Sequence, residues 1–78
     1  MATAEERGAE LIRFVASALV SAPDEINVVV AEDGVLELEA NESDRGRVIG
    51  RQGRVAKAMR ALLARTPGCS DLPLEIVD

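Results

Sequence analysis

The sequence predicts a single α+β domain over residues 1–78, in which a helix, two strands, two helices and a last strand follow one another. Three observations lead to this fold class. Apolar residues recur at helical spacing near the N-terminus and again around residue 60. Between these segments they alternate with polar residues on both sides of an Asp-Gly dipeptide. A chain of 78 residues has room for one hydrophobic core.

The first helix is predicted to begin at Thr3. Thr3 and Glu6 have the spacing of a capping box, in which a hydroxyl and a carboxylate satisfy amide groups at a helix start. The apolar face is expected to comprise Leu11, Ile12, Val15 and Leu19, widened by Phe14 and Ala18. Pro23 ends the helix, because proline restricts the residue before it and cannot donate a backbone hydrogen bond.

Residues 26–40 are predicted to form a β-hairpin. The first strand alternates Ile26, Val28 and Val30 on one face, and the second alternates Leu36 and Leu38 with Glu37 and Glu39. Asp33-Gly34 lies between them and is favoured in a tight primed turn, where φ is positive.

The second half of the chain predicts two helices and a strand. Residues 41–50 form a short helix with Asn41 or Ser43 as N-cap, and Gly50 ends it. A longer helix runs from about residue 54 to 65, and its expected core face is Val55, Ala58, Met59 and Leu62. Residues 71–78 form a strand with Leu72, Leu74 and Ile76 on one face, and Pro73 indicates a sheet edge.

The distribution of charge is uneven. The chain is acidic, with a formal charge of −5, yet residues 45–65 carry +7 and the remainder −12. That segment contains no acid and seven of the nine basic residues: Arg45, Arg47, Arg51, Arg54, Lys57, Arg60 and Arg65. Since salt limits the reach of a charge to about 8 Å, an anion at this segment interacts mainly with the local cations.

Two glycines stand inside this basic segment, at positions 50 and 53. Glycine lets the chain turn sharply and leaves amide groups uncovered, and the positive end of the following helix points at the same loop. Together these features predict an anion site of the kind that phosphate occupies. A Gly-x-x-Gly pair alone also occurs in plain turns between helices, so the prediction depends on the basic flanks and the preceding helix-strand-strand order.

Several classes of function are disfavoured by what the chain lacks. It has no His, Tyr or Trp, and its acids are scattered, so no catalytic site, metal site or cofactor is expected. The spacing of the glycines fits neither a P-loop nor a dinucleotide-binding loop. Cys69 is expected to be an incidental loop cysteine, and the absence of a signal-like start or a long apolar run predicts a cytoplasmic protein. Phe14 is the single aromatic, so the core should consist of Val, Leu, Ile and Ala and should gain from a partner subunit.

The segment "RVIGRQGRVAKAMRALL" resembles the signature of KH domains, and nearly the whole chain resembles the KhpA family of bacterial RNA-binding proteins. The segments "LVSAPDEINV", "DGVLELEANESDRGRVIG" and "LEIVD" carry the rest of this resemblance. It implies a type II KH domain of order α-β-β-α-α-β, with three helices packed on a three-stranded mixed sheet.

The resemblance also implies a site for single-stranded RNA. Gly50, Arg51, Gln52 and Gly53 would meet phosphates, flanked by Arg47, Arg54 and Lys57. Val48, Ile49 and the second strand are the candidates for an apolar groove under the bases, although Ile49 fits a core position equally well. The first variable loop position is commonly Lys in KH domains; Arg51 keeps the charge and adds a planar fork for phosphate.

The resemblance further implies partners and a cellular role. Such proteins are thought to self-associate and to pair with KhpB, a larger KH-domain protein, as an RNA chaperone or regulator linked to cell elongation and wall synthesis. A candidate dimer face is Ala56, Ala61, Leu63 and Ala64, which are equally explained as helix-favouring residues. The alternatives to RNA binding are a protein-interaction adaptor and a module for single-stranded DNA.

Overall fold

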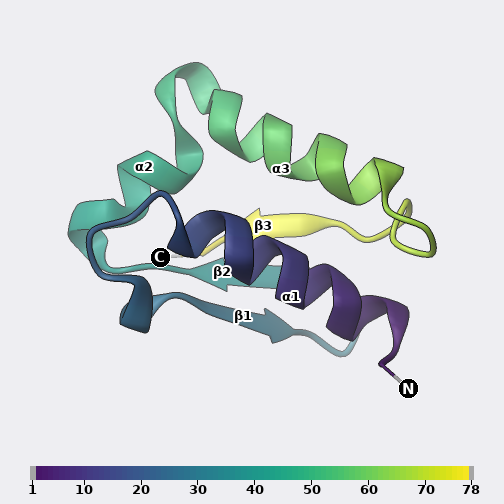
Figure 1. The fold of residues 1–78 in the computed structure, drawn as a ribbon. Coiled ribbons are helices and arrows are strands. Elements are labelled where there is room, and N and C mark those ends of the chain that lie inside the picture. The colour runs from purple at the N-terminus through teal and green to yellow at the C-terminus, as the bar shows by residue number, and fades with distance from the viewer. Residues whose placement is uncertain (1, 78) are drawn as a thin grey trace.

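The computed structural model describes residues 2–77 and shows helices packed against one face of a three-stranded sheet (Figure 1). Residues 1 and 78, which belong to the predicted domain and last strand, lie outside the described residues. The elements are α1 (Ala4–Ser17), β1 (Asn27–Val30), β2 (Leu36–Glu39), α2 (Arg45–Ile49), α3 (Arg54–Arg65) and β3 (Leu74–Ile76). Short 3₁₀ turns span Pro23–Glu25, Glu42–Asp44 and Arg51–Gly53. The predicted α-β-β-α-α-β order is confirmed.

The sheet is mixed, as predicted, with the strand order β1-β2-β3. β1 pairs antiparallel with β2 through the hairpin, and β3 pairs parallel with β2. A parallel pair needs a long crossover connection, and α2 and α3 supply it. The loop that joins these two helices lies within the crossover, at the end of the molecule away from the sheet (Figure 1).

Helix α1 begins with the predicted capping box. The Thr3 hydroxyl accepts a hydrogen bond from the Glu6 amide at 3.1 Å, and the Glu6 carboxylate accepts one from the Thr3 amide at 2.9 Å. The predicted apolar face is wrong at Phe14, whose side chain is 76% exposed. Ile12 is fully buried, and Phe14 follows it by about 200° around the helix, so the ring points away from the sheet. The buried face is Ala9, Ile12 and Ala16, with Gly8 beside it.

The hairpin forms where predicted, but its turn differs. The Gly34 amide donates to the Ala31 carbonyl at 3.0 Å, and the Ala31 amide donates to the Val35 carbonyl at 2.9 Å. This pattern closes a three-residue loop, in which Gly34 has a φ of 85° and Asp33 has no positive φ. A primed turn built on Asp33-Gly34 is therefore wrong, because the first of its two central residues would need a positive φ.

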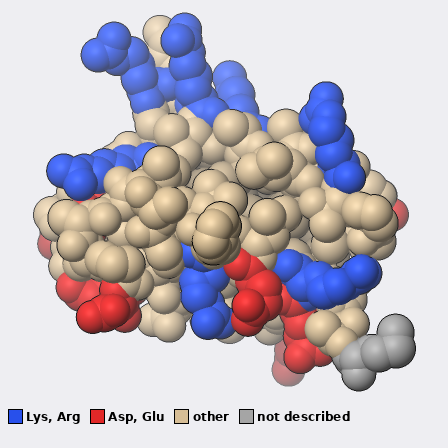
Figure 2. All heavy atoms as spheres, viewed as in Figure 1, with Lys and Arg blue, Asp and Glu red and all other residues tan. Residues whose placement is uncertain are grey.

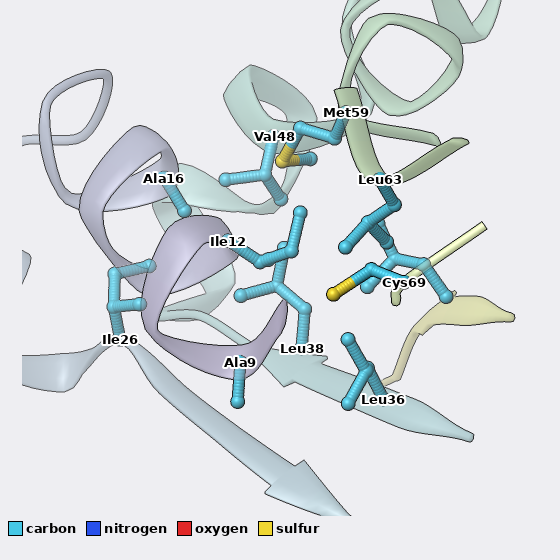
Figure 3. Close-up of a cluster of buried hydrophobic side chains, with 11 residues drawn as sticks. Ala9, Ile12, Ala16, Ile26, Leu36, Leu38, Val48, Met59, Leu63 and Cys69 are labelled. Carbon is cyan, nitrogen blue, oxygen red and sulfur yellow. The ribbon is translucent and has the colours of Figure 1, made fainter. Parts of the chain in front are cut away.

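The core lies between the sheet and the helices (Figure 3). It comprises Ala9, Ile12, Ala16, Ile26, Leu36, Leu38, Val48, Met59, Leu63, Cys69 and Leu74. Val, Leu, Ile and Ala dominate this core as expected, and it also contains Met59, which was expected on the core face of α3, and Cys69, which was not expected there. Cys69 is fully buried rather than an incidental loop residue, and its thiol donates to the Ala4 carbonyl at 3.3 Å.

Helix α3 is rotated relative to the prediction. Its buried residues are Ala56, Met59 and Leu63, whereas Ala58 is exposed and Leu62 is 43% exposed. In this orientation the Arg60 guanidinium donates from Nε and Nη2 to the Leu74 carbonyl of β3 at 3.3 and 3.0 Å, which links α3 to β3. The candidate dimer face on this helix is therefore wrong for Ala56 and Leu63, which belong to the interior, while Ala61 and Ala64 are exposed.

Candidate nucleic-acid interface

The connection between α2 and α3 has an unusual backbone. Three of its four residues have positive φ: Gly50 at 78°, Gln52 at 57° and Gly53 at 73°. Gln52, with ψ of 25°, is the one non-glycine residue with positive φ among residues 2–77. This conformation turns the chain sharply between two helices and explains why glycine stands at both ends of the loop.

The two glycines serve different purposes. A β-carbon at Gly50 would lie 2.5 Å from Cγ2 and 2.7 Å from the backbone nitrogen of Val55, so the loop returns closely onto α3. A β-carbon at Gly53 would meet no atom within 4 Å. Gly50 is therefore required by close packing as well as by its φ, and Gly53 by its φ alone.

The loop leaves backbone amides available to a ligand. The Gly50 amide donates to Gly46 at 2.8 Å and the Gly53 amide to Gly50 at 3.1 Å. Within residues 2–77 the amides of Arg51 and Gln52 donate no hydrogen bond. Helix α3 begins directly after the loop, and no side chain of the described residues caps its N-terminus. Two donors and the positive end of a 12-residue helix thus converge on the same loop.

Basic side chains surround these donors. Arg51, Arg54 and Lys57 are exposed, and Figure 2 shows Lys and Arg side chains projecting from the end of the molecule that carries the loop in Figure 1. The Arg54 guanidinium donates to the Gln52 side-chain oxygen at 3.3 Å. Arg47 is also exposed and lies 3.8 Å from the Asp44 carboxylate. The structure therefore brings the predicted polar site residues together at one end of the molecule.

The predicted apolar groove is partly wrong. Val48 is fully buried in the core and its side chain has no surface for a base to contact. Leu36 and Leu38 of the second strand are likewise fully buried, because β2 is the central strand beneath the helices. Ile49 is 37% exposed and precedes the loop, so it is the apolar residue of this set that a base could contact.

Asp44 positions the helix before the loop, and sequence reasoning missed it. Its carboxylate is 1% exposed and accepts hydrogen bonds from the Ser21 amide and hydroxyl at 3.1 and 2.8 Å and from the Ala22 amide at 3.0 Å. The hydrogen bond from the Ser21 amide is the main cause that holds the pKa of Asp44 below its usual value, against the opposing effect of burial. Asp44 thereby ties the start of α2 to the chain that leaves α1. The predicted cap at Asn41 is also present, accepting from the Ser43 amide at 2.8 Å.

Residues 2–77 contain no helix long and apolar enough to span a membrane. They contain no group of three Cys, Asp or Glu side chains arranged to hold a metal ion.

Comparison with known proteins gives a consistent result. The family model described as KhpA/KhpB, KH domain matches residues 9–67. A protein of Treponema pallidum named RNA-binding protein KhpA is 41% identical over the whole of both chains. The protein of the same name from Borreliella burgdorferi is 42% identical over 88% of this chain and 90% of its own length. That from Halalkalibacterium halodurans is 40% identical over 87% of this chain and 96% of its own.

No solved structure matches this chain significantly. The family assignment therefore depends on the sequence match, with which the observed element order, mixed sheet and Gly-x-x-Gly loop agree. The chain belongs to the KhpA/KhpB family of KH domains.

Proposed function

We propose that this protein binds single-stranded RNA through the loop 50–53, as an RNA chaperone or post-transcriptional regulator. The observation that carries the proposal is the loop geometry: two available amides, an uncapped helix start and exposed cations at one end of the molecule. The name RNA-binding protein KhpA, borne by relatives that match most of the chain, supports RNA as the ligand.

The binding step follows from the loop. A phosphate accepts hydrogen bonds from the amides of Arg51 and Gln52, where the dipole of α3 favours negative charge. The Arg51 guanidinium offers a fork that matches two phosphate oxygens. Arg54 and Lys57 lie in the first turn of α3 and meet the neighbouring phosphates of a strand of about four nucleotides. Gly50 and Gly53 carry no β-carbon, so the strand can approach the backbone closely at both ends of the loop.

The expected affinity of one such site is low. The one aromatic residue, Phe14, lies on α1 and not at the loop, so base stacking worth about 1–3 kcal/mol per base is missing there. Three neutralised phosphates give a slope of about −2 for log K against log salt concentration. Two sites held in one assembly raise the effective affinity without new contacts.

Self-association, and pairing with a larger KhpB-like KH-domain protein in the cytoplasm, belong to the same proposal. Both supply the second site that a weak single site needs. The role in cell elongation and wall synthesis is supported by family resemblance. The groups described at the loop are amide donors and cations, which bind phosphate, so the proposed activity is binding and not catalysis.

The test is the affinity of the protein for a short single-stranded RNA after two loop substitutions, Arg51→Asp and Gln52→Asp. Both side chains are exposed, and Asp tolerates the left-handed backbone at position 52, so the fold is retained. The double substitution lowers the net charge by three. The pair Arg7→Asp and Ser70→Asp changes the charge equally at exposed positions of α1 and of the segment before β3, away from the loop 50–53, and serves as the control.

The proposal predicts that the loop variant loses at least tenfold in affinity while the control stays within about threefold of the wild type. Equal losses in both variants would show a general effect of charge and contradict the loop as the site. Unchanged affinity in the folded loop variant would favour the adaptor alternative. A single-stranded DNA of the same sequence, measured in parallel, separates RNA from DNA binding.

A further inference from the structure

The outer edge of β3 carries a backbone carbonyl that is bonded to a cation of α3. β3 is an edge strand of the sheet and lies beside α3 (Figure 1). The Leu36 amide of β2 donates to the Pro73 carbonyl, and the carbonyls of successive residues alternate between the two sides of a strand. The Leu74 carbonyl therefore points away from β2. It accepts hydrogen bonds from Nε and Nη2 of Arg60, so this edge position presents a cation in place of an acceptor.

The contact with Leu74 leaves donors of the Arg60 guanidinium available. A guanidinium is a planar fork of five N–H groups. Nε and the adjacent hydrogen of Nη2 are directed at the Leu74 carbonyl, so Nη1 and the second hydrogen of Nη2 form a pair of parallel donors at the end of the side chain. Within residues 2–77 Nη1 donates no hydrogen bond, and Arg60 is exposed. The edge of β3 therefore offers two donors to a ligand, in a plane that the Leu74 carbonyl fixes.

Arg60 also ends a row of cations that starts at the loop 50–53. Arg54, Lys57 and Arg60 follow one another at intervals of three residues on α3, so they are neighbours on the helix surface, and all three are exposed. From Arg54 to Arg60 the helix rises by about 9 Å. A strand of about four nucleotides covers at least about 10 Å even when its bases are stacked. A strand whose phosphates lie at the loop can therefore extend as far as Arg60.

We propose that Arg60 determines a base preference, by binding the Hoogsteen edge of a guanine in the RNA strand held at the loop. The inference rests on the RNA binding proposed above and names the base that the site selects. Guanine has two neighbouring acceptors on this edge, O6 and N7, and two arginine donors bound to this pair are the commonest specific contact with a base. In a single strand the Hoogsteen edge is accessible, because the base can turn out of the stack.

The other bases match this pair of donors less well. Adenine has an amino group beside N7, so its N6 hydrogens would face the arginine donors. Uracil has an N–H group between its two carbonyls, so it offers one acceptor to the fork at a time. Cytosine has adjacent acceptors at O2 and N3, which makes it the nearest competitor of guanine at Arg60.

The bond to Leu74 distinguishes Arg60 from the other arginines of α3. A long side chain loses rotamer freedom when it binds a ligand, and Arg60 has already lost part of that freedom through its contact with β3. Arg65 is also exposed, but its guanidinium donates to the Ala61 carbonyl of its own helix at 3.3 Å. It lies about 140° around α3 from Arg60. Arg65 therefore serves as the matched control for a substitution of Arg60.

The test compares short uridine RNAs that carry a guanosine, an adenosine, a cytidine or no replacement at the central position. Fluorescence anisotropy measures their affinities at one salt concentration. The wild type should bind the guanosine RNA at least about fivefold more tightly than the others, which is the lower end of what one bidentate contact discriminates. Inosine keeps O6 and N7 and should bind like guanosine. Replacement by 7-deazaguanosine, which lacks N7, should remove most of the preference.

Two substitutions assign the preference to its residue. Arg60→Lys keeps the charge but removes the fork, so it should abolish the guanosine preference while its affinity for the uridine RNA stays within about twofold of the wild type. Arg65→Lys should keep the preference. Circular dichroism checks that both variants are folded. The readout is the ratio of two affinities of the same protein, which a loss of folded protein does not change.

The outcomes separate the inference from the proposal beneath it. Equal affinity of the wild type for all of these RNAs would refute base selection and leave the proposed RNA binding intact. A preference for cytidine, a guanosine preference that survives Arg60→Lys, or an equal loss of affinity for every RNA in that variant would each overturn the role of Arg60. Failure of the wild type to bind any RNA would overturn the proposed function and the inference with it.

Discussion

Gly50→Ala is predicted to destabilise the protein far more than Gly53→Ala, although both replace a glycine of the same loop. Gly50 has φ 78° and ψ 169°, a region that L-residues avoid at a cost of about 1–3 kcal/mol. Its new β-carbon would also lie 2.5 Å from Cγ2 and 2.7 Å from the backbone nitrogen of Val55. Overpacking of this kind costs a further 1–3 kcal/mol, roughly.

Gly53 has φ 73° and ψ 16°, the ordinary left-handed region, and its β-carbon would meet nothing. Its substitution by alanine should cost about 1 kcal/mol. A domain of 78 residues has a total stability of about 4–12 kcal/mol. Gly50→Ala, at about 2–6 kcal/mol, therefore removes a large part of it, and Gly53→Ala a small part.

The assays are urea unfolding and thermal unfolding, both followed by circular dichroism at 222 nm, because the chain has no Trp or Tyr for fluorescence. Gly53→Ala should lower the melting temperature by about 4–8 °C, and Gly50→Ala by clearly more than 10 °C. Gly50→Ala combined with Val55→Ala should recover part of the loss, since it removes the 2.5 Å contact but keeps the contact with the backbone nitrogen. Equal losses for the two single variants would refute the assignment of a packing role to Gly50.

Three further predictions concern residues outside the loop. Asp44→Asn should destabilise the fold at neutral pH. The difference in melting temperature from wild type should shrink as pH falls below about 3.8, because a carboxyl with a lowered pKa loses its stabilising effect when it is protonated. Melting curves from pH 7 to 2 measure this difference, and a constant difference would contradict the prediction. Arg60→Ala should lower the free energy of unfolding by about 1 kcal/mol, because the Leu74 carbonyl loses its charged donor. Arg60→Lys should recover only part of this free energy in the same urea assay. An unchanged free energy of unfolding in Arg60→Ala would show that α3 keeps its orientation without Arg60. Cys69, fully buried, should react with a thiol reagent only in urea; rapid reaction in the native protein would place it at the surface.

Much of this fold could be predicted because its signals are local. The Thr3–Glu6 capping box, the alternation around Gly34 and the glycines that bound the loop each depend on residues a few positions apart. The parallel return of β3 followed from family resemblance and not from local pattern. These elements were enough to place the basic loop at the start of α3.

The features that the sequence did not predict depend on contacts between residues that are far apart in the chain. Helix α3 has apolar residues on more than one side, so the sequence did not reveal that Leu63 rather than Leu62 enters the core. The hydrogen bond from Arg60 to Leu74 of β3 accompanies this orientation, and it joins positions 14 residues apart. Asp44 was expected at the surface like the other acids. Its hydrogen-bond partners Ser21 and Ala22 precede the hairpin in the sequence and lie 23 and 22 residues before Asp44, so no local pattern joins them to it.

The exposure of Phe14 was missed for a different reason. Apolar residues surround much of α1, and Phe14 was expected to widen the apolar face of this helix. The spacing from Ile12 could have shown that the two side chains lie on opposite sides of the helix. Phe14 therefore departs from the buried face of α1 and stands exposed on the other side of the helix.

The most direct test of the central claim is an NMR titration of the labelled protein with a short single-stranded RNA. The account predicts that the largest amide shifts occur at Arg51, Gln52 and the first turn of α3, while Val28–Val30 on β1 change little. Saturable shifts centred on another surface, with the loop amides unmoved, would contradict it.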